Sequence, residues 1–281
     1  MKEVITVAIQ GEAGSYHDLA ARKYFNRHNL IIHQCRTFKN VCQQVLAGET
    51  EYGIMAIENS LAGSLLPNYA LLQEYALSIV GEEYVRIEHH LMALPGQKIS
   101  DIRIVRSHPM ALMQCSDFLE KYPDIQQVES DDTAGTARQI AKRREKSIAA
   151  IAGSRAAHLF HLDILAQGIE NLKQNYTRFF VIKRRTAENK LDGNKASLNF
   201  RIGHYVGSLA EILNMFREHQ LNLTLIQSIP IPGRADEYRF HVDVEWENTD
   251  NFTGALEKIG KMVQEVSILG IYQKAQRTGS V

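Results

Sequence analysis

Short apolar runs alternate with helical segments along the first 160 residues, and turn or capping residues separate them. The β-rich run 4–9 leads into a glycine-rich loop, and a helical pattern begins after Ser15. A second helix is expected between Thr37 and Gly48, followed by a buried strand at 53–57. This alternation predicts parallel α/β layers, whose ligands bind beyond the carboxyl ends of the strands.

The same pattern continues further along the chain. Strands are expected at 103–106, 126–129 and 147–151, helices at 133–142 and 154–159, and extended chain at 78–94. Polar loops follow three of the predicted strands, at 11–16, 58–64 and 107–109. We therefore expect these three loops to lie together at the edge of the sheet where ligands bind.

The pattern changes after a polar stretch at 184–195, which is typical of a linker. The C-terminal part then shows strands at 197–202, 223–229, 238–244 and 267–272, with helices beginning at 207 and 252. This order is β-α-β-β-α-β, a ferredoxin-like unit of about 80 residues. We predict one domain at 1–185, a linker at 186–195 and a second domain at 196–281.

Composition excludes several classes of protein. Lys plus Arg equals Asp plus Glu, at 32 each, so no global field attracts nucleic acid or an anionic membrane. The basic run 142–144 beside Glu145 is interpreted as a solvated helix end. No apolar run is long enough for a membrane span, and the N-terminus has no signal-peptide core. A cytoplasmic protein is expected.

Cysteine and histidine usage suggests neither disulfides nor a metal. The cysteines are odd in number, have no CxxC spacing and fit reduced thiols; they are Cys35, Cys42 and Cys115. His89 and His90 are adjacent, so they point to opposite sides of a strand. His158 and His161 have no carboxylate at a known ligand spacing, so we expect no metal site.

Residues 175–179, Asn-Tyr-Thr-Arg-Phe, place a hydroxyl, a fixed cation and two aromatic rings just before an apolar strand. On a strand Thr177 and Phe179 share one face, and Tyr176 and Arg178 share the other. One interpretation is an edge strand with an exposed arginine. The other is the wall of a pocket in which the Thr177 hydroxyl meets a substrate.

Six motifs in order carry a family resemblance: GEAGSYHDLAA, GIMAIENSLAGSL, SHPMALMQC, DDTAGTARQIA, AAIAGSRAAHLF and NYTRFFVI. Together they resemble the prephenate dehydratase domain, and the last 80 or so residues resemble an ACT regulatory domain. The resemblance implies an α/β fold of two lobes like a periplasmic-binding protein, with the site in the cleft between them. It also implies loss of water and carbon dioxide from prephenate to give phenylpyruvate.

The resemblance implies a catalytic role for Thr177, and it places the IENS loop in the pocket with Glu58, Asn59 and Ser60. Whether Thr177 or a buried Glu58 is the general acid stays open, and His108 is interpreted as a structural helix-start residue. Substrate contacts are expected from Ser15, Tyr16, Ser64, Arg178 and Phe179. Free backbone N–H groups at Ser15, Ser60 and Ser64, together with Arg178 or hydroxyl groups, are expected to hold the dianion. No cofactor is required.

A phenylalanine effector site is implied in the C-terminal domain at Gly207, Ser208, Leu209, Ala210, Asn222, Leu223, Gln227 and Ser228. Gln227 and Ile229 stand where the family has Glu and Arg in its ESRP motif, which predicts a weak response to phenylalanine. Ala56 and Ala62 also depart from the family pattern, which often has Pro and an acidic residue there, and we expect these changes to alter the stiffness of the loop without removing the chemistry. A homodimer or homotetramer is expected.

Two alternatives remain open from the sequence. The substrate is either prephenate or its amino form arogenate, because nothing in the motifs distinguishes a ketone from an amine. A non-catalytic amino-acid sensor with the same fold is the second alternative, since a fold alone does not decide function.

Overall fold

The computed structural model describes residues 3–185, 192–203, 205–231 and 238–276. They form two compact units, of which the first combines Met1–Ser64 with Tyr84–Phe179. The second unit combines Leu65–Glu83 with Phe180–Val281. Each unit is described by itself below.

A sheet in the order β2-β1-β3-β11-β5 carries the N-terminal strands. Its members are β2 (Asn29–Cys35), β1 (Val4–Gln10), β3 (Tyr52–Asn59), β11 (Tyr176–Arg184) and β5 (Leu77–Arg86), with the short β4 (Gly63–Ser64) paired to β3. The strand β1 runs parallel to both β2 and β3, so the predicted parallel α/β layer is confirmed. The pattern at 29–35 was not predicted as a strand. The parts of β5 and β11 at 77–83 and 180–184 belong to the second unit.

The helix α1 (Tyr16–Tyr24) begins after Ser15 as predicted, and α2 (Phe38–Ala47) lies between Thr37 and Gly48 as predicted. Thr37 caps α2 by accepting the N–H of Asn40 at 3.1 Å, and Gly48 ends the helix at a φ of 78°. Ser15 caps α1 by accepting the N–H of Asp18, at 3.4 Å. The Asp18 carboxylate accepts from Gly14 and not from Ser15, so only half of a capping box forms.

A second sheet, wholly in the first unit, has the order β10-β6-β9-β7-β8. These strands are β10 (Asp163–Ala166), β6 (His90–Ala93), β9 (Ile148–Ala152), β7 (Ile104–Ser107) and β8 (Gln126–Glu129). The three loops predicted to share one sheet edge therefore follow strands of two sheets, because β7 belongs here while β1 and β3 belong to the first sheet. The antiparallel strand β10 was not predicted.

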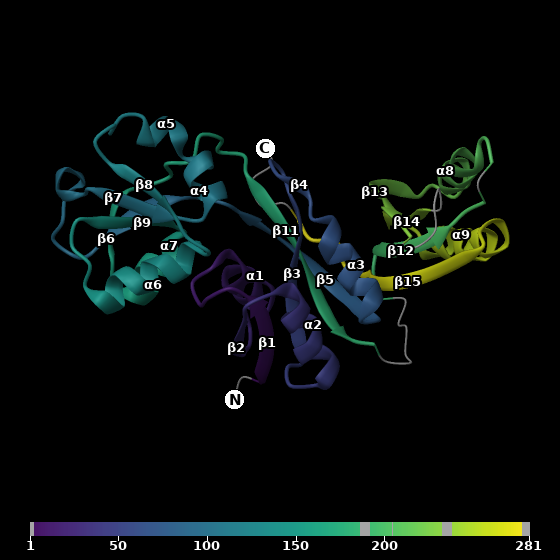
Figure 1. The fold of residues 1–281 in the computed structure, drawn as a ribbon. Coiled ribbons are helices and arrows are strands. Elements are labelled where there is room, and N and C mark those ends of the chain that lie inside the picture. Colours follow the sequence, from purple (N-terminus) through teal and green to yellow (C-terminus); the bar gives the residue numbers. More distant parts are fainter. Residues whose placement is uncertain (1–2, 186–191, 204, 232–237, 277–281) are drawn as a thin grey trace. The chain divides into compact units, whose positions relative to one another are not determined.

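Helices cover both faces of this second sheet (Figure 1). One face packs on α4 (Pro109–Gln114) and α5 (Ser116–Leu119) through a core that includes Leu91, Val105 and Leu112. The other face packs on α6 (Thr133–Arg143) and α7 (Ser154–Phe160) through Met92, Ala150 and Ile140. Alanine dominates this second core, which lets both helices approach the strands closely.

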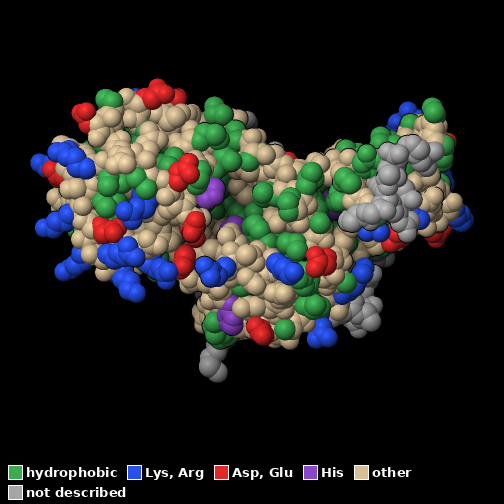
Figure 2. Space-filling model, viewed as in Figure 1, with side chains coloured by type: hydrophobic (Ala, Val, Ile, Leu, Met, Phe, Trp, Pro, Cys, Tyr) green, Lys and Arg blue, Asp and Glu red, His purple; other side chains and the backbone are tan. Residues whose placement is uncertain are grey.

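The basic run 142–144 is exposed at the end of α6, as predicted for a solvated helix end. Figure 2 shows Lys and Arg side chains gathered over the part of the molecule that holds α6 and α7. Glu145 forms ion pairs with Arg106 at 3.2 Å and with Arg143 at 3.7 Å, so acidic partners lie among them. Among the described residues, no helix is both long and apolar enough to cross a membrane.

The second unit holds a four-stranded sheet in the order β13-β14-β12-β15. Its elements in chain order are β12 (Lys195–Arg201), α8 (Ser208–Glu218), β13 (Asn222–Pro230), β14 (Tyr238–Glu245), α9 (Thr249–Met262) and β15 (Glu265–Tyr272). The predicted β-α-β-β-α-β order is confirmed, with both helices packed on one face around Phe200, Phe216 and Phe252. The helix α3 (Leu66–Glu74) completes the unit.

The predicted linker is only partly described, because residues 186–191 lie outside the described ranges. Its last residues already belong to the sheet. Asn194 donates its N–H to the carbonyl of Tyr272 at 3.2 Å and accepts from Trp246 at 3.1 Å. The strand β12 then begins at Lys195, two residues before the predicted start.

Polar side chains are buried on the face of β12 and β14 that the helices leave uncovered. The Lys195 ammonium is 2 % exposed and lies 3.0 Å from Glu82 and 3.1 Å from Glu245. A Cβ on Gly270 would overlap the carbonyl oxygen of Ile79, so only glycine fits where β15 meets β5. This face therefore packs closely on the 65–83 segment of its own unit.

Candidate active site

Thr177 and Asn59 meet where two strands of the first sheet lie side by side. The amide nitrogen of Asn59, the last residue of β3, lies 2.9 Å from the hydroxyl oxygen of Thr177 on β11. Thr177 is 8 % exposed, so this contact is largely shielded from water. The structure thus brings two of the predicted catalytic residues together from positions 118 residues apart in the chain.

The direction of this hydrogen bond is fixed by the backbone of the 58–64 turn. The N–H groups of Leu61 and Ala62 both donate to Oδ1 of Asn59, at 3.0 Å and 2.9 Å. The nitrogen of that amide must therefore be the atom that faces Thr177. Since the Thr177 oxygen accepts from Asn59, its own proton points elsewhere. Among the described residues, that hydroxyl has no second partner.

Ser60 joins the turn to β11 and uses its polar groups in doing so. Its N–H donates to the carbonyl of Tyr176 at 2.9 Å, and its hydroxyl accepts the N–H of Tyr176 at 2.9 Å. The N–H of Ser15 likewise donates to Glu12 at 3.1 Å. The prediction that these two N–H groups are free to hold a substrate is therefore wrong, because both are paired within the chain.

Glu58 is half-buried and pairs with Ser64 across the β3–β4 hairpin. Neighbouring residues of a strand point to opposite faces, so Glu58 does not share the face on which Asn59 meets Thr177. Arg178 is buried at 3 % exposure within β11. Phe179 is also buried, and its ring stands edge-on to His17 with centroids 5.0 Å apart. Contacts of these residues with a substrate stay predictions.

The glycine-rich loop after β1 is tightly fitted against the helices of the second sheet. Gly14 has a φ of 87°, and a Cβ there would lie 3.1 Å from the Cα of Ala156 on α7. Asp18 links the same elements, because its buried carboxylate accepts from Arg155 at 2.6 Å. The loop N–H of Glu12 donates to Asp132 at 3.3 Å. The loop N–H groups of Glu12 and Gly14 are therefore hydrogen-bonded to carboxylates of the protein, those of Asp132 and Asp18.

A chain of buried polar side chains continues from Asn59 into the second sheet, and the sequence had not predicted it as part of the site. Asn175 accepts from Asn59 at 2.8 Å and donates to Oε1 of Gln114 at 3.1 Å. The same oxygen lies 3.0 Å from Nε2 of His89. The hydroxyl oxygen of Tyr16 lies 3.0 Å from Nδ1 of His89 and 2.8 Å from the carbonyl oxygen of Glu88, so its single proton is shared between these two acceptors.

The signal for these residues was present but incomplete. Asn175 and Gln114 lie in two of the six motifs. A motif identifies a residue type, but it does not show that the side-chain amides of two motifs are in contact in the fold. His89 was considered only as a metal ligand. Burial lowers the pKa of His89 and raises the pKa of Tyr16, so both side chains are neutral near pH 7.

His108 has the structural role expected of a helix-start residue. It precedes α4 and its Nδ1 accepts the N–H of Met110 at 3.2 Å. The side chain is exposed and is occupied as a cap. This geometry agrees with the interpretation of His108 as a structural residue.

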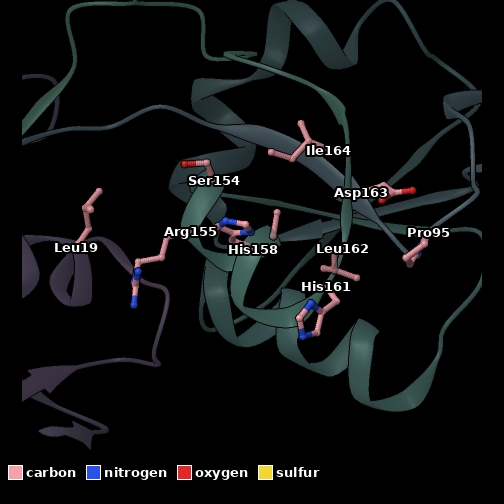
Figure 3. A pocket seen from close by; sticks show the side chains of 10 residues that line it. Leu19, Pro95, Ser154, Arg155, His158, His161, Leu162, Asp163 and Ile164 are labelled. Carbon is pink, nitrogen blue, oxygen red and sulfur yellow. The ribbon is translucent and has the colours of Figure 1, made fainter. Parts of the chain in front are cut away.

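A separate surface hollow of about 690 Å³ lies beside α7 (Figure 3). Figure 3 shows Arg155 extending from α7 toward the segment that carries Leu19, where it pairs with Asp18. His158 and His161 also line the hollow, but the described residues contain no group of ligands suited to a metal ion. None of the predicted catalytic residues lines it.

The predicted reduced cysteines agree with the structure. Cys35, Cys42 and Cys115 are buried and form no disulfide.

The predicted effector residues fall into two places in the second unit. Gly207–Ala210 begin α8, at the end of the sheet where β12 ends, and Gln227 and Ser228 lie near the same end of β13. Asn222 and Leu223 lie at the opposite end of β13, about 13–20 Å from Gln227 and Ser228 at roughly 3.3 Å per residue. One copy of the chain therefore does not gather all eight residues in one place.

A family model described as prephenate dehydratase matches residues 7–187. The chain belongs to the prephenate dehydratase family. All the predicted catalytic residues and the amide chain through Gln114 lie inside the matched range. The β12–β15 sheet lies outside it, so the family model says nothing of this sheet.

Relatives with known names match nearly all of this chain. The bifunctional chorismate mutase/prephenate dehydratase of Escherichia coli K12 is 34% identical over 271 residues, covering 95% of this chain and 70% of that protein. A bifunctional N-acyl-homoserine lactone acylase/prephenate dehydratase of Komagataeibacter europaeus is 33% identical over 269 residues and 95% of both chains. Arogenate dehydratase/prephenate dehydratase 2 of Arabidopsis thaliana is 35% identical over 281 residues, covering 95% and 72%.

Solved structures agree with this assignment. A prephenate dehydratase from Arthrobacter aurescens in complex with L-Phe has a TM-score of 0.81 at 26% identity, covering 99% of this chain and 92% of that one. The quorum-quenching acylase GqqA has a TM-score of 0.87 at 32% identity, covering 96% and 98%. Both similarities extend over the C-terminal sheet as well as the first 187 residues.

Proposed function

We propose that this chain converts prephenate to phenylpyruvate, with Thr177 as the hydrogen-bond donor to the departing hydroxyl group. The observation that supports this most directly is the hydrogen bond from Asn59 to the Thr177 oxygen, because it leaves the hydroxyl proton available to a ligand. Membership of the prephenate dehydratase family supplies the reaction, a lyase reaction that needs no redox cofactor.

In this reaction two bonds of the substrate break. The bond between the ring and its carboxylate breaks and releases carbon dioxide, and its electron pair enters the ring. The carbon–oxygen bond at the opposite ring carbon breaks, the oxygen leaves with the electron pair of that bond, and a proton taken up from the solvent converts the hydroxide to water. Thr177 is a weak acid, so its contribution is a hydrogen bond that strengthens as negative charge develops on the leaving oxygen.

Glu58 is the weaker candidate for the proton donor. A carboxylic acid must stay protonated near pH 7 to act as general acid, and this requires burial. Glu58 is only half-buried, and strand alternation directs it away from the face of Asn59. Ser60 supports the site as a structural link between the turn and β11.

Substrate contacts are proposed for Ser15, Tyr16, Ser64, Arg178 and Phe179. The proposal for Tyr16 and Phe179 concerns their rings, since the Tyr16 hydroxyl is used by Glu88 and His89. Closure of the site around a dianion would exclude water and favour decarboxylation. These five contacts rest on the resemblance of the motifs.

The substrate is tested by comparing prephenate with arogenate. The Arabidopsis relative is named for both activities, so arogenate is the specific alternative. We expect kcat/KM for prephenate to exceed that for arogenate, measured with the two substrates side by side. An N-acyl-homoserine lactone belongs in the same assay because of the Komagataeibacter relative. Absence of turnover with all three, together with tight ligand binding, would favour a non-catalytic sensor.

We also infer that residues 196–281 form an ACT domain that follows a catalytic domain at 1–185. The β-α-β-β-α-β order and the similarity to an L-Phe-bound prephenate dehydratase support this inference. L-phenylalanine is the proposed effector, with weak inhibition because of Gln227 and Ile229. Tight, saturable binding of L-phenylalanine, measured by calorimetry, together with strong inhibition of turnover would overturn the prediction of a weak response.

Oligomerisation and location follow from the same proposal. The eight effector positions lie at both ends of β13, so a second copy that brings the opposite end near would complete one site. A homodimer or homotetramer is therefore proposed, and sedimentation of the purified protein tests it.

A cytoplasmic location is proposed because none of the three cysteines forms a disulfide.

A further inference from the structure

His89 is a buried histidine that the proposed mechanism has not used. It lies between β5 and β6 and is 3 % exposed. Its backbone N–H donates to the carboxylate of Glu170 at 2.9 Å, which holds the residue in place. Both ring nitrogens lie 3.0 Å from polar atoms, Nε2 from Gln114 and Nδ1 from the Tyr16 hydroxyl.

The proton on the His89 ring is located by following the hydrogen bonds from their fixed end. Backbone N–H groups fix the oxygen of Asn59, so its nitrogen donates to Asn175. The nitrogen of Asn175 then faces Gln114, whose Oε1 must be the acceptor. That oxygen also faces Nε2 of His89, so Nε2 carries a proton.

The oxygen of Gln114 therefore receives two donors from opposite sides. Asn175 approaches it from β11, and His89 approaches it from the segment before β6. Without the second donor the Gln114 amide gains freedom to turn its nitrogen toward His89. That turn would place two amide nitrogens against each other at Asn175 and disturb the bond to Asn59.

We propose that His89 is a positioning residue: its Nε2–H holds Gln114, and through Asn175 and Asn59 this fixes the Thr177 hydroxyl in the direction of the substrate. The inference rests on the proposed function, in which Thr177 donates to the departing oxygen. The ring and the backbone N–H of His89 hydrogen-bond to Tyr16, Gln114 and Glu170 and not directly to Thr177 or Asn59. His89 acts through the buried amides of Gln114 and Asn175, which are 9 % and 0 % exposed, and through the half-buried amide of Asn59 in the 58–64 turn.

Two variants separate the two ring nitrogens. In His89→Gln the side-chain amide reaches about as far as Nε2, so a donor to Gln114 is retained. In His89→Asn the amide reaches only about as far as Nδ1, so that donor is lost. We expect His89→Gln to keep kcat within about threefold, and His89→Asn to lower kcat by about tenfold or more with KM nearly unchanged.

His90→Asn is the matched control. His90 is also buried, at 6 % exposure, and its Nδ1 accepts the N–H of Gly168 at 3.2 Å, which an Asn side chain can still do. We expect its kcat to equal that of the unchanged chain. Equal losses in His89→Gln and His89→Asn, or a loss that falls only on KM, would overturn the positioning role.

A second measurement does not depend on turnover. Nitrogen NMR of the isotope-labelled full chain distinguishes a protonated from an unprotonated Nε2, and the His89→Gln variant identifies the signal. Protonated Nε2 with unprotonated Nδ1 is expected, whereas an unprotonated Nε2 would overturn the proposal. If the chain formed no phenylpyruvate, the proposed function would fail while this reading of His89 remained testable.

Discussion

The amide nitrogen of Asn59 donates to the hydroxyl oxygen of Thr177 across 2.9 Å, and two backbone N–H groups prevent that amide from turning over. The Thr177 oxygen is thereby an acceptor toward the protein and a donor toward the site. A neutral hydroxyl held in this way needs no reorganisation as charge develops on a leaving oxygen.

Replacing Asn59 by Asp tests the direction of this bond. Asn59→Asp keeps an oxygen for the N–H groups of Leu61 and Ala62 but presents a second acceptor to Thr177. The Thr177 proton would then turn toward the new carboxylate, and we expect kcat to fall by about 10²-fold or more. Steady-state kinetics with prephenate measures this, with circular dichroism as the check on folding. A kcat within a few-fold of the unchanged chain would contradict the assigned direction.

His17 makes the fold sensitive to acid. Its ring lies between Phe38 and Phe179, and burial lowers its pKa to about 4. Between about pH 6.5 and that value the unfolded chain binds a proton that the folded chain does not, so stability falls as the pH falls through this window. The slope from this residue is at most about 1.4 kcal/mol per pH unit.

His17→Phe should remove that component, so its unfolding free energy should fall less between pH 7 and pH 4.5. Urea unfolding at several pH values provides the measurement. His158→Gln, a change at an exposed histidine on α7, is the control and should keep the original pH dependence. Identical pH dependence in His17→Phe and the unchanged chain would show that His17 is not buried in its neutral form.

Lys195 anchors the buried polar face of the second unit. Its ammonium pairs with Glu82, which is buried, and with Glu245. Lys195→Met removes the cation beside the buried Glu82 carboxylate and should cost about 3–5 kcal/mol of unfolding free energy, whereas adding Glu82→Gln should recover part of the loss. Lys274→Met is the control, since Lys274 is exposed and lies 3.4 Å from Glu245; it should cost about 1 kcal/mol or less. Similar losses in the two single variants would contradict this account.

The sequence alone predicted the alternation of elements and several of their ends. Thr37 and Gly48 bound α2 because a hydroxyl cap and a left-handed glycine are local requirements, readable without knowledge of the rest of the fold. The β-α-β-β-α-β order was predictable because the apolar pattern and the turn residues of each element are also local features of the sequence. The strands β2 and β10 were missed, because both depend on pairing with strands distant in sequence.

The site was predictable in its residue types and not in its connections. Thr177 and Asn59 were identified from motifs, and the structure places them in contact. The N–H groups of Ser15 and Ser60 looked free in the sequence, but backbone partners take them once the chain folds. Gln114 and His89 could not be connected to Thr177, because their role depends on a path of hydrogen bonds through four separate segments.

The most direct test of the Thr177 hydroxyl is the rate of phenylpyruvate formation from prephenate by Thr177→Val and Thr177→Ser. Valine keeps the shape of threonine without the hydroxyl, and serine keeps the hydroxyl. The account predicts that Thr177→Val lowers kcat by about 10²–10³-fold while Thr177→Ser stays within about tenfold of the unchanged chain. Near-normal turnover by a folded Thr177→Val variant would contradict the account.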